Sequence, residues 1–310
     1  MNKVLVNILI FCLGSAFLSY ADSSRVFAPV NSPEIPSKVS VCGEKIDLDR
    51  TEYYEAFDRE LTSIIYNHGT SMLILKRANR YFPELIPLLK ANGVPEDFVY
   101  LAVVESSLNN RAYSPAKAAG IWQFIPSTAK QYGLEVNDDV DERYNLEKAT
   151  EAACRYFKKS YEKYGDWASV MASFNGGQAR ITKELEAQQA STALDLWLAE
   201  ETTRYPYRIA AYKEFMSNPQ KYGYKIKDSQ LYQPRAYTIE KVSVPVEDWV
   251  AWASERGLTY AQLRDANPWI RSKTLPNKTG KTYFVKIPAK ESLSRKTGDK
   301  TVFSEAWTID

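Results

Sequence analysis

Apolar side chains recur every three or four positions over residues 51–225, and this period is typical of amphipathic helices. Within residues 51–66 the pattern places four of them on one face: Phe57, Leu61, Ile64 and Ile65. Further helices are predicted over residues 72–81, 84–90, 95–106, 146–164 and 166–175. We therefore expect residues 51–225 to form a mainly helical domain.

Residues at the ends of these segments support the helices. Thr51 is a suitable N-cap, and Pro95 is tolerated in a first helical turn because its missing N–H would have no partner there. Gly165 predicts the end of the long helix 146–164, since glycine readily adopts positive φ. Asp166 can cap the next helix, which Asn175 and the two glycines behind it end.

The pattern changes after residue 225. Runs at 236–244 and 281–287 are rich in Tyr, Thr, Val and Ile, which is typical of strands. Two helical stretches, 246–256 and 259–266, lie between them. Residues 235–290 are thus predicted to form a small α+β domain with the order strand-helix-helix-strand, and residues 291–310 a polar tail.

The first 21 residues have the parts of a secretory signal peptide. Lys3 is followed by an apolar stretch, 4–18, which is shorter than the ~20 residues of a spanning helix. Small residues precede a cleavage point after Ala21, and an uncleaved anchor is the alternative. No small residue precedes Cys12, so lipid anchoring has little support. We expect an exported protein of the periplasm or cell envelope, with membrane association left open.

Residues 22–50 contain three prolines and no sustained period, which predicts a linker or extended arm. Export would bring Cys42 and Cys154 into an oxidising compartment, where they can form a disulfide. Equally, Cys154 can be a small buried hydrophobic residue without a disulfide. The sequence leaves both alternatives open.

Composition limits the chemistry, because the 310 residues include one His and three Cys. A Ser-His-Asp triad or a Cys-His pair would have to use His68, to which we assign a structural role. Sites with two His or four Cys ligands are excluded. The net charge of +2 gives no support for a nucleic-acid partner. We expect no metal and no cofactor, and a chemistry of carboxylates, hydroxyls and amides.

The helix predicted over 95–106 contains an acid on its apolar face. Phe98, Leu101 and Ala102 define that face, and Glu105 is the next position on it. Partial burial and the nearby helix C-terminus both raise the pKa of a carboxyl group, which keeps it protonated near neutral pH. Cleavage of a glycosidic bond needs such a proton. From spacing alone, a Glu that reaches solvent is the alternative.

Further motifs follow Glu105-Ser106 in order: Ala-Gly-Ile-Trp-Gln at 119–123, Ile-Pro-Ser-Thr-Ala at 125–129, Ser-Phe-Asn-Gly-Gly at 173–177 and Glu-Thr-Thr-Arg-Tyr at 201–205. This succession resembles the catalytic domain of lytic transglycosylases of the soluble type, particularly the membrane-bound D subgroup. The resemblance covers residues 51–222. It implies a lysozyme-like helical domain, related to goose lysozyme, that acts on peptidoglycan.

The resemblance implies that Glu105 is the catalytic acid and Ser106 its hydrogen-bonding neighbour. It also implies that four residues bind substrate: Gly120, Gln123, Asn175 and Tyr205. Tight turns, a helix cap and core packing are the structural alternatives for such positions, and Trp122 is left between core and site. Ser173-Phe174 departs from the usual Ala-Tyr, which puts one polar contact in doubt.

Retaining and inverting glycosidases use two carboxylates, and these motifs supply one. The acidic run at 138, 139, 141 and 142 is interpreted as a solvated loop beside a helix start. The resemblance implies that Glu105 protonates the β-1,4 bond between N-acetylmuramic acid and N-acetylglucosamine. It then takes the proton of the muramoyl 6-hydroxyl, which attacks C1 to give a 1,6-anhydro product. A lysozyme-type hydrolase and a non-catalytic peptidoglycan-binding protein are the alternatives.

The C-terminal domain is similar to a LysM module. The similarity is carried by residues 237–240, 257–259, 267–268 and 285–288, while the usual Gly-Asp-Thr-Leu after the first strand is replaced by residues 242–246. Binding to N-acetylglucosamine chains is implied, and a module that only packs on the catalytic domain is the alternative. The expected partners are peptidoglycan glycan strands and cell-envelope proteins of unspecified identity.

Overall fold

Helices form most of the chain between residues 51 and 222 in the computed structural model, which describes residues 31–295 and 300–309. The longer ones are α1 (Thr51–Tyr66), α2 (His68–Ala91), α3 (Val99–Ser106), α4 (Pro126–Gln131), α5 (Leu146–Tyr164), α6 (Trp167–Gly176), α7 (Gln178–Ala187) and α8 (Glu200–Ser217). The mainly helical fold is confirmed. The predicted signal peptide lies outside the described residues.

Local signals predict α5 and the start of α6 correctly. Gly165 follows α5 with φ +74°, and the side chain of Asp166 accepts a hydrogen bond of 2.8 Å from the backbone N–H of Ser169. A left-handed glycine and an N-cap carboxylate satisfy backbone groups within one helical turn. Because both act over such short distances, the residues next to them are sufficient to place these helix ends.

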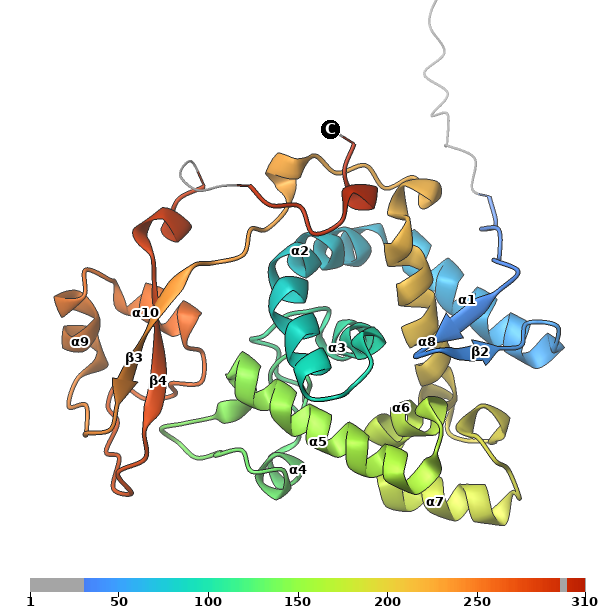
Figure 1. Ribbon diagram of the computed structural model, residues 1–310, viewed down its shortest axis with the longest axis horizontal. Helices are drawn as coiled ribbons and strands as arrows, with labels where there is room; N and C mark the ends of the chain where they lie inside the picture. The colour runs from blue at the N-terminus through green and yellow to red at the C-terminus, as the bar shows by residue number, and fades with distance from the viewer. Residues whose placement is uncertain (1–30, 296–299, 310) are drawn as a thin grey trace, which may run out of the picture. The chain divides into compact units, whose positions relative to one another are not determined.

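Helix α2 is continuous, whereas two helices were predicted. Pro83 and Pro87 lie inside it, and Figure 1 shows that it bends. A proline within a helix costs about 3 kcal/mol. One buried apolar face continues past both prolines, through Phe82, Leu85 and Leu89. Packing of that face against the core therefore outweighs the local cost of the prolines.

Helix α3 lies in the middle of the helical part, with α2, α5, α6 and α8 around it (Figure 1). It packs directly against α8 and α2, and α8 packs in turn against α1 and α6. Its side chains Val99, Leu101, Ala102 and Val103 are all buried. The end of α3 is therefore held firmly from several sides, and this is the end that contains Glu105.

The segment predicted as a linker contains a hairpin. Strands β1 (Val39–Val41) and β2 (Glu44–Ile46) pair antiparallel, and three of their side chains join the helical core: Val39, Val41 and Ile46. Cys42 and Gly43 form the turn, both with positive φ, as two-residue hairpins require. Strands of three residues are too short to show a period in the sequence.

Cys42 and Cys154 are free thiols, so the structure has no disulfide between them. Cys154 is buried among the core residues of α5, and burial raises the pKa of its thiol to about 12. Of the two alternatives, the small buried hydrophobic residue describes Cys154.

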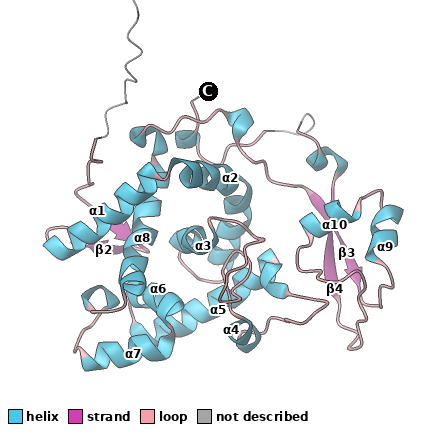
Figure 2. Cartoon of the chain, turned by 180° about the vertical axis from the view of Figure 1, so that it is seen from behind, coloured by secondary structure: helices cyan, strands magenta, loops and turns pink. Residues whose placement is uncertain are grey.

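Residues 237–288, the C-terminal module, have the predicted order strand-helix-helix-strand. Strands β3 (Tyr237–Val242) and β4 (Tyr283–Pro288) pair antiparallel, with helices α9 (Trp249–Glu255) and α10 (Tyr260–Ala266) between them in sequence. Figure 2 shows the strands of the described chain in two places only, this pair and the N-terminal hairpin. The module's core includes Trp249, Leu263 and Val285.

The acidic run was predicted to be a solvated loop, which is wrong for half of it. Asp138 is exposed, but Asp141 and Glu142 are 6% and 2% exposed. Asp141 pairs with the buried Arg143, and Glu142 with Lys148 and Lys281. Their partners come partly from a segment 139 residues away, so the sequence around the run gives no sign of burial.

The predicted polar tail packs back onto the helices. Trp307 is 2% exposed, and its Nε1–H donates to the carbonyl of Met216 over 2.6 Å. Asn79 of α2 binds the carbonyl of Thr301 and the N–H of Phe303. Among residues 31–295 and 300–309, no helix combines the length and apolar character needed to cross a membrane.

Candidate active site

The helix that contains Glu105 ends one residue after it. Helix α3 ends at Ser106, and the next residues, Ser107 and Leu108, have φ of 52° and 56°. Non-glycine residues in this left-handed region cost of order 1–3 kcal/mol and persist only where their surroundings hold them. Leu108 is fully buried, and Arg77 of α2 donates a hydrogen bond of 3.0 Å to the carbonyl of Ser107. The position of Glu105 is thus anchored on both sides.

Ser106 connects the end of α3 to the second motif. Its Oγ lies 2.9 Å from the carbonyl oxygen of Ile121 and 3.1 Å from that of Ala102. The hydroxyl therefore holds the backbone between Gly120 and Gln123 beside the helix end. In this arrangement Ser106 supports the second motif, whereas a contact with Glu105 itself was predicted.

Tyr205 reaches Glu105 from α8, 100 residues further along the chain. Its hydroxyl donates a hydrogen bond to Oε1 of Glu105, and Tyr205 itself is 2% exposed. Glu105 is only partly buried, so its carboxyl group remains within reach of solvent. A buried phenol on one side and solvent access on the other suit a carboxyl group that donates a proton to a substrate.

The environment keeps Glu105 partly protonated near neutral pH. Burial raises the pKa of Glu105 from its ordinary 4.5 to about 7. The hydrogen bond from Tyr205 opposes this rise, because it stabilises the carboxylate. The negative charge of Glu201 adds to the rise, and the positive charge of Arg208 opposes it. Arg208 is itself bound to the buried Glu60 by a hydrogen bond of 2.8 Å.

Residues 117–124, the motif loop, form a tight reversal around Gly120. The φ of Gly120 is +78°, and a Cβ atom at this position would lie 1.8 Å from the carbonyl oxygen of Arg143. Only glycine fits here. Gln123 has φ 49°, and its Nε2 donates to the carbonyl of Gly120 over 2.7 Å. Its Oε1 forms no hydrogen bond with any described residue and remains available as an acceptor.

Trp122 belongs to the core. It is fully buried, its Nε1–H donates to Oγ1 of Thr150 over 2.9 Å, and its ring packs edge-on against Phe157. A buried indole whose N–H is satisfied inside the protein has no free group for a ligand. The choice between core and site, which the sequence left open, is therefore resolved in favour of the core.

Asn175 is held next to α8, the helix of Tyr205. Its Oδ1 accepts a hydrogen bond of 2.8 Å from Oγ1 of Thr202. Gly176 permits this approach, since a Cβ there would lie 3.0 Å from Cγ2 of Thr202. Thr202 and Tyr205 are three residues apart and hence on the same face of α8. Asn175 is only partly buried, so its amide remains accessible.

Phe174, which stands where the third motif usually has Tyr, is held in place by packing. The ring of Phe174 lies 5.6, 5.1 and 5.2 Å from three other rings, those of Phe124, Tyr156 and Phe157. Ser173 is buried, and its Oγ donates to the carbonyl of Val170. The side chain at 174 is thus fixed by neighbouring rings without a hydroxyl of its own.

The structure joins Glu105 to Tyr205 and Ser106 to the motif loop, whereas Asn175 binds Thr202 of α8, a residue that was not predicted. No hydrogen bond between Gln123 and Glu105 occurs among the described residues. Thr202 and Arg143 were missed as site residues. Thr202 lies inside the Glu-Thr-Thr-Arg-Tyr motif at 201–205. Arg143 follows the acidic run, and nothing in the neighbouring sequence indicates its role.

Residues 86–196 match the family described as Transglycosylase SLT domain, and residues 238–291 match the Soluble lytic transglycosylase C-terminal LysM-like domain. The Membrane-bound lytic murein transglycosylase D of Escherichia coli is 30% identical over 221 residues, which are 70% of this chain and 48% of that protein. The chain therefore spans about half the length of this curated relative.

Two solved structures are also similar. The 70 kDa soluble lytic transglycosylase of Escherichia coli has 18% identity and a TM-score of 0.40, covering 53% of this chain and 29% of its own. An inactive mutant of the lytic transglycosylase Slt from Pseudomonas aeruginosa has 15% identity and a TM-score of 0.35. The similarity covers 44% of this chain and 24% of that protein's chain.

Proposed function

Because the chain has a transglycosylase SLT domain followed by a LysM-like domain, it belongs to the lytic transglycosylase family, and we propose that it cleaves peptidoglycan without water. The bond cleaved is the β-1,4 bond between N-acetylmuramic acid and N-acetylglucosamine, and the product is a 1,6-anhydromuramoyl end. One observation carries the proposal: Glu105 has a pKa near 7 and accepts a hydrogen bond from the buried Tyr205.

Glu105 acts first as an acid. With its pKa raised to about 7, much of it is protonated at neutral pH, which matches the ideal for proton transfer at that pH. Since Oε1 accepts the hydroxyl proton of Tyr205, the proton of the neutral acid resides on Oε2. It passes to the glycosidic oxygen as the bond to C1 breaks, and the N-acetylglucosamine chain leaves.

Glu105 acts next as a base. The carboxylate formed in the first step is stabilised by the Tyr205 hydroxyl, which is already in place. It takes the proton from the muramoyl 6-hydroxyl, whose oxygen attacks C1 and closes the 1,6-anhydro ring. The attacking group belongs to the same sugar, and such tethering gives high effective concentration.

The cationic centre at C1 must be stabilised between the two steps. The substrate's own acetamido group can do this, and the amides of Asn175 and Gln123 are suited to hold that group or the neighbouring hydroxyls. Glu201 raises the pKa of Glu105 through its charge, and this is the role we assign to it. A second catalytic carboxylate is not needed, because no water has to be activated.

The substrate implies the remaining assignments. We propose peptidoglycan glycan strands as the ligand of both the site and the C-terminal module, and export to the periplasm or cell envelope. Ser106, Gly120, Gln123, Asn175 and Tyr205 are proposed to form the substrate-binding surface around Glu105. Partners among cell-envelope proteins remain unspecified.

Digestion of purified murein sacculi tests the reaction. Wild-type protein and Glu105→Gln are incubated with sacculi, and the soluble products are identified by mass spectrometry. We expect 1,6-anhydro muropeptides from the wild type and a loss of at least about 10³-fold in Glu105→Gln. Glu162→Gln, on the exposed face of α5, is the matched control and should keep full activity.

Each other result is informative. Products with free reducing ends would show a lysozyme-type hydrolase. Binding to sacculi without any soluble product would show a non-catalytic peptidoglycan-binding protein. Undiminished cleavage by Glu105→Gln would exclude Glu105 as the acid.

A further inference from the structure

The C-terminal module is joined through its backbone to a loop of the helical part. Residues 135–144, the bridging loop, pair with it through an antiparallel bridge between Val140 and Ile270. The N–H of Asp141 donates to the carbonyl of Trp269 over 2.9 Å. The N–H of Arg271 donates to the carbonyl of Asp139 over 2.8 Å. Backbone pairing of this kind fixes both the position and the direction of the loop.

Side chains strengthen the same junction. Lys281 donates to Oε2 of Glu135 over 2.7 Å and to Oε1 of Glu142 over 2.8 Å, and the hydroxyl of Tyr283 donates to Glu135. Glu142 is almost fully buried. Burial raises its pKa, but the hydrogen bonds from Lys148 and Lys281 outweigh this and lower it overall. Glu142 is thus ionised and paired at neutral pH.

The other side of the bridging loop supports the active site. Arg143 is 4% exposed and forms a two-pronged ion pair with Asp141, with Nε–Oδ1 and Nη2–Oδ2 distances of 2.9 and 2.7 Å. Its Nη1 donates to the carbonyls of Lys117 and Phe124, at the two ends of the motif loop. The carbonyl of Arg143 is also the group that leaves no room for a side chain at Gly120.

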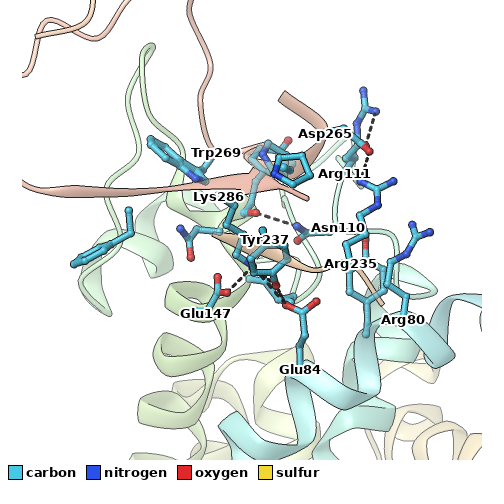
Figure 3. Close-up of a pocket in the computed structure, with 18 residues that line it drawn as sticks. Arg80, Glu84, Asn110, Arg111, Glu147, Arg235, Tyr237, Asp265, Trp269 and Lys286 are labelled. Carbon is cyan, nitrogen blue, oxygen red and sulfur yellow. Dashed lines mark hydrogen bonds and ion pairs between the residues drawn. The ribbon is translucent and has the colours of Figure 1, made fainter. Parts of the chain in front are cut away.

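A second contact prevents the module from turning about the bridging loop. Figure 3 shows Lys286 and Tyr237 of the module beside Glu84 of α2 and Glu147 of α5. Lys286 lies 2.5 Å from Glu147 and 3.4 Å from Glu84, and the hydroxyl of Tyr237 donates to Glu84 over 2.5 Å. These residues line a pocket of about 90 Å³ between the module and the two helices.

We infer that the C-terminal module positions the motif loop of the active site, with Asp141 and Arg143 as the positioning residues between them. The path runs from Lys281 and Ile270 to the bridging loop, from there to Arg143, and from Arg143 to both ends of the motif loop. The inference rests on the proposed function for what the motif loop binds. It assigns to the module a task in the active site that is separate from any glycan binding of its own.

Amide hydrogen exchange on the full-length protein tests whether the C-terminal module holds the motif loop in position. Lys281→Met removes the bonds to Glu135 and Glu142 and leaves Arg143 intact, so the chain should still fold. We expect the amides of Ala119 and Gly120 to exchange about tenfold faster, as the loss of hydrogen bonds to charged groups would allow. Amides of α6 should not change. Lys278→Met, at an exposed lysine of the same module, is the matched control and should match the wild type.

Unchanged exchange at Ala119 and Gly120 in Lys281→Met would overturn the inference. Equal acceleration in Lys278→Met would overturn it too, because Lys278 forms no ion pair among the described residues. This measurement needs no substrate. It therefore decides the inference even where the wild type fails to release anhydro products, a result that would refute only the proposed function.

Kinetics on soluble glycan strands test the catalytic consequence. In Lys281→Met we expect KM to rise about tenfold, while the pH profile of kcat stays in place because Glu105 keeps its neighbours. If the module acts through the motif loop, the combined loss in kcat/KM with Gln123→Ala should be smaller than the product of the two single losses. A strictly multiplicative loss, or a shifted pH profile, would contradict positioning of this loop.

Discussion

The hydroxyl of Tyr205 donates a hydrogen bond to Oε1 of Glu105, joining the second turn of α8 to the end of α3. The phenol is buried and cannot exchange this partner for water. It stabilises the carboxylate in a place where burial favours the neutral acid. The balance between the two effects sets the pKa of Glu105 near 7, which is what the proposed role of this carboxyl group as acid and then as base requires.

Tyr205→Phe should shift the pH dependence of cleavage. Without the hydroxyl, the effect that lowers the pKa of Glu105 is lost, so its pKa rises further. The alkaline limb of kcat/KM should move to higher pH, and kcat should fall about 10²-fold because the carboxylate intermediate loses its donor. Rates of muropeptide release across pH 5–9 measure both effects. A limb that moves to lower pH would contradict the role given to Tyr205.

Glu201→Gln should have the opposite effect on the pKa. Its negative charge raises the pKa of Glu105, so neutralising it lowers that pKa and moves the alkaline limb toward acid. Activity below that limb should persist within a few-fold. Glu186→Gln, exposed on α7, serves as the control. A loss comparable to that of Glu105→Gln would instead identify Glu201 as a second catalytic carboxylate.

Glu105 should make the stability of the protein depend on pH. Its pKa is about 7 when folded and near 4.5 when unfolded, so the folded state binds more protons between these values. Stability therefore falls as pH rises from 4.5 to 7, by up to about 3 kcal/mol. Glu105→Gln removes this penalty and should be more stable than the wild type at pH 8, with little difference at pH 4.

Urea denaturation of both proteins at the two pH values measures this difference. Glu162→Gln, which alters an exposed carboxyl group on α5, should leave the wild-type dependence intact. Equal stability of Glu105→Gln and wild type at pH 8 would mean that the raised pKa is not a property of the folded protein.

Gly120→Ala should destabilise the protein far more than Gly133→Ala. Both glycines have positive φ, which costs alanine about 1–2 kcal/mol. At Gly120 the added Cβ also lies 1.8 Å from the carbonyl oxygen of Arg143, whereas at Gly133 the nearest atom is a flexible guanidinium nitrogen at 3.7 Å. We expect about 4 kcal/mol for Gly120→Ala. Thermal and urea unfolding of the pair measure the difference, and equal losses would contradict the clash.

Several features of the fold follow from residues that are close together in the chain. The apolar period of α5, Gly165 behind it and Asp166 before α6 act within one or two helical turns, and the predicted ends agree with the structure. The position of Glu105 on an apolar face is local information as well. Its special environment could therefore be suspected before any partner was known.

Features that depend on distant partners escaped such reasoning. Pro83 breaks a helix by local rules, yet α2 continues because its apolar face is packed on the core. Asp141 and Glu142 have the composition of a solvated loop, yet both are buried, and Glu142 is neutralised in part by Lys281, which lies 139 residues away. A local pattern contains no record of these partners.

The candidate active site combines both kinds of information. Period, capping and motif order indicate which residues to examine, since each depends on neighbours a few positions away. The bond between Tyr205 and Glu105, the burial of Trp122 and the support of Gly120 by Arg143 are contacts between segments 23 to 100 residues apart. They arise only when the segments of the helical part pack together, because burial and charge pairing are properties of the packed chain.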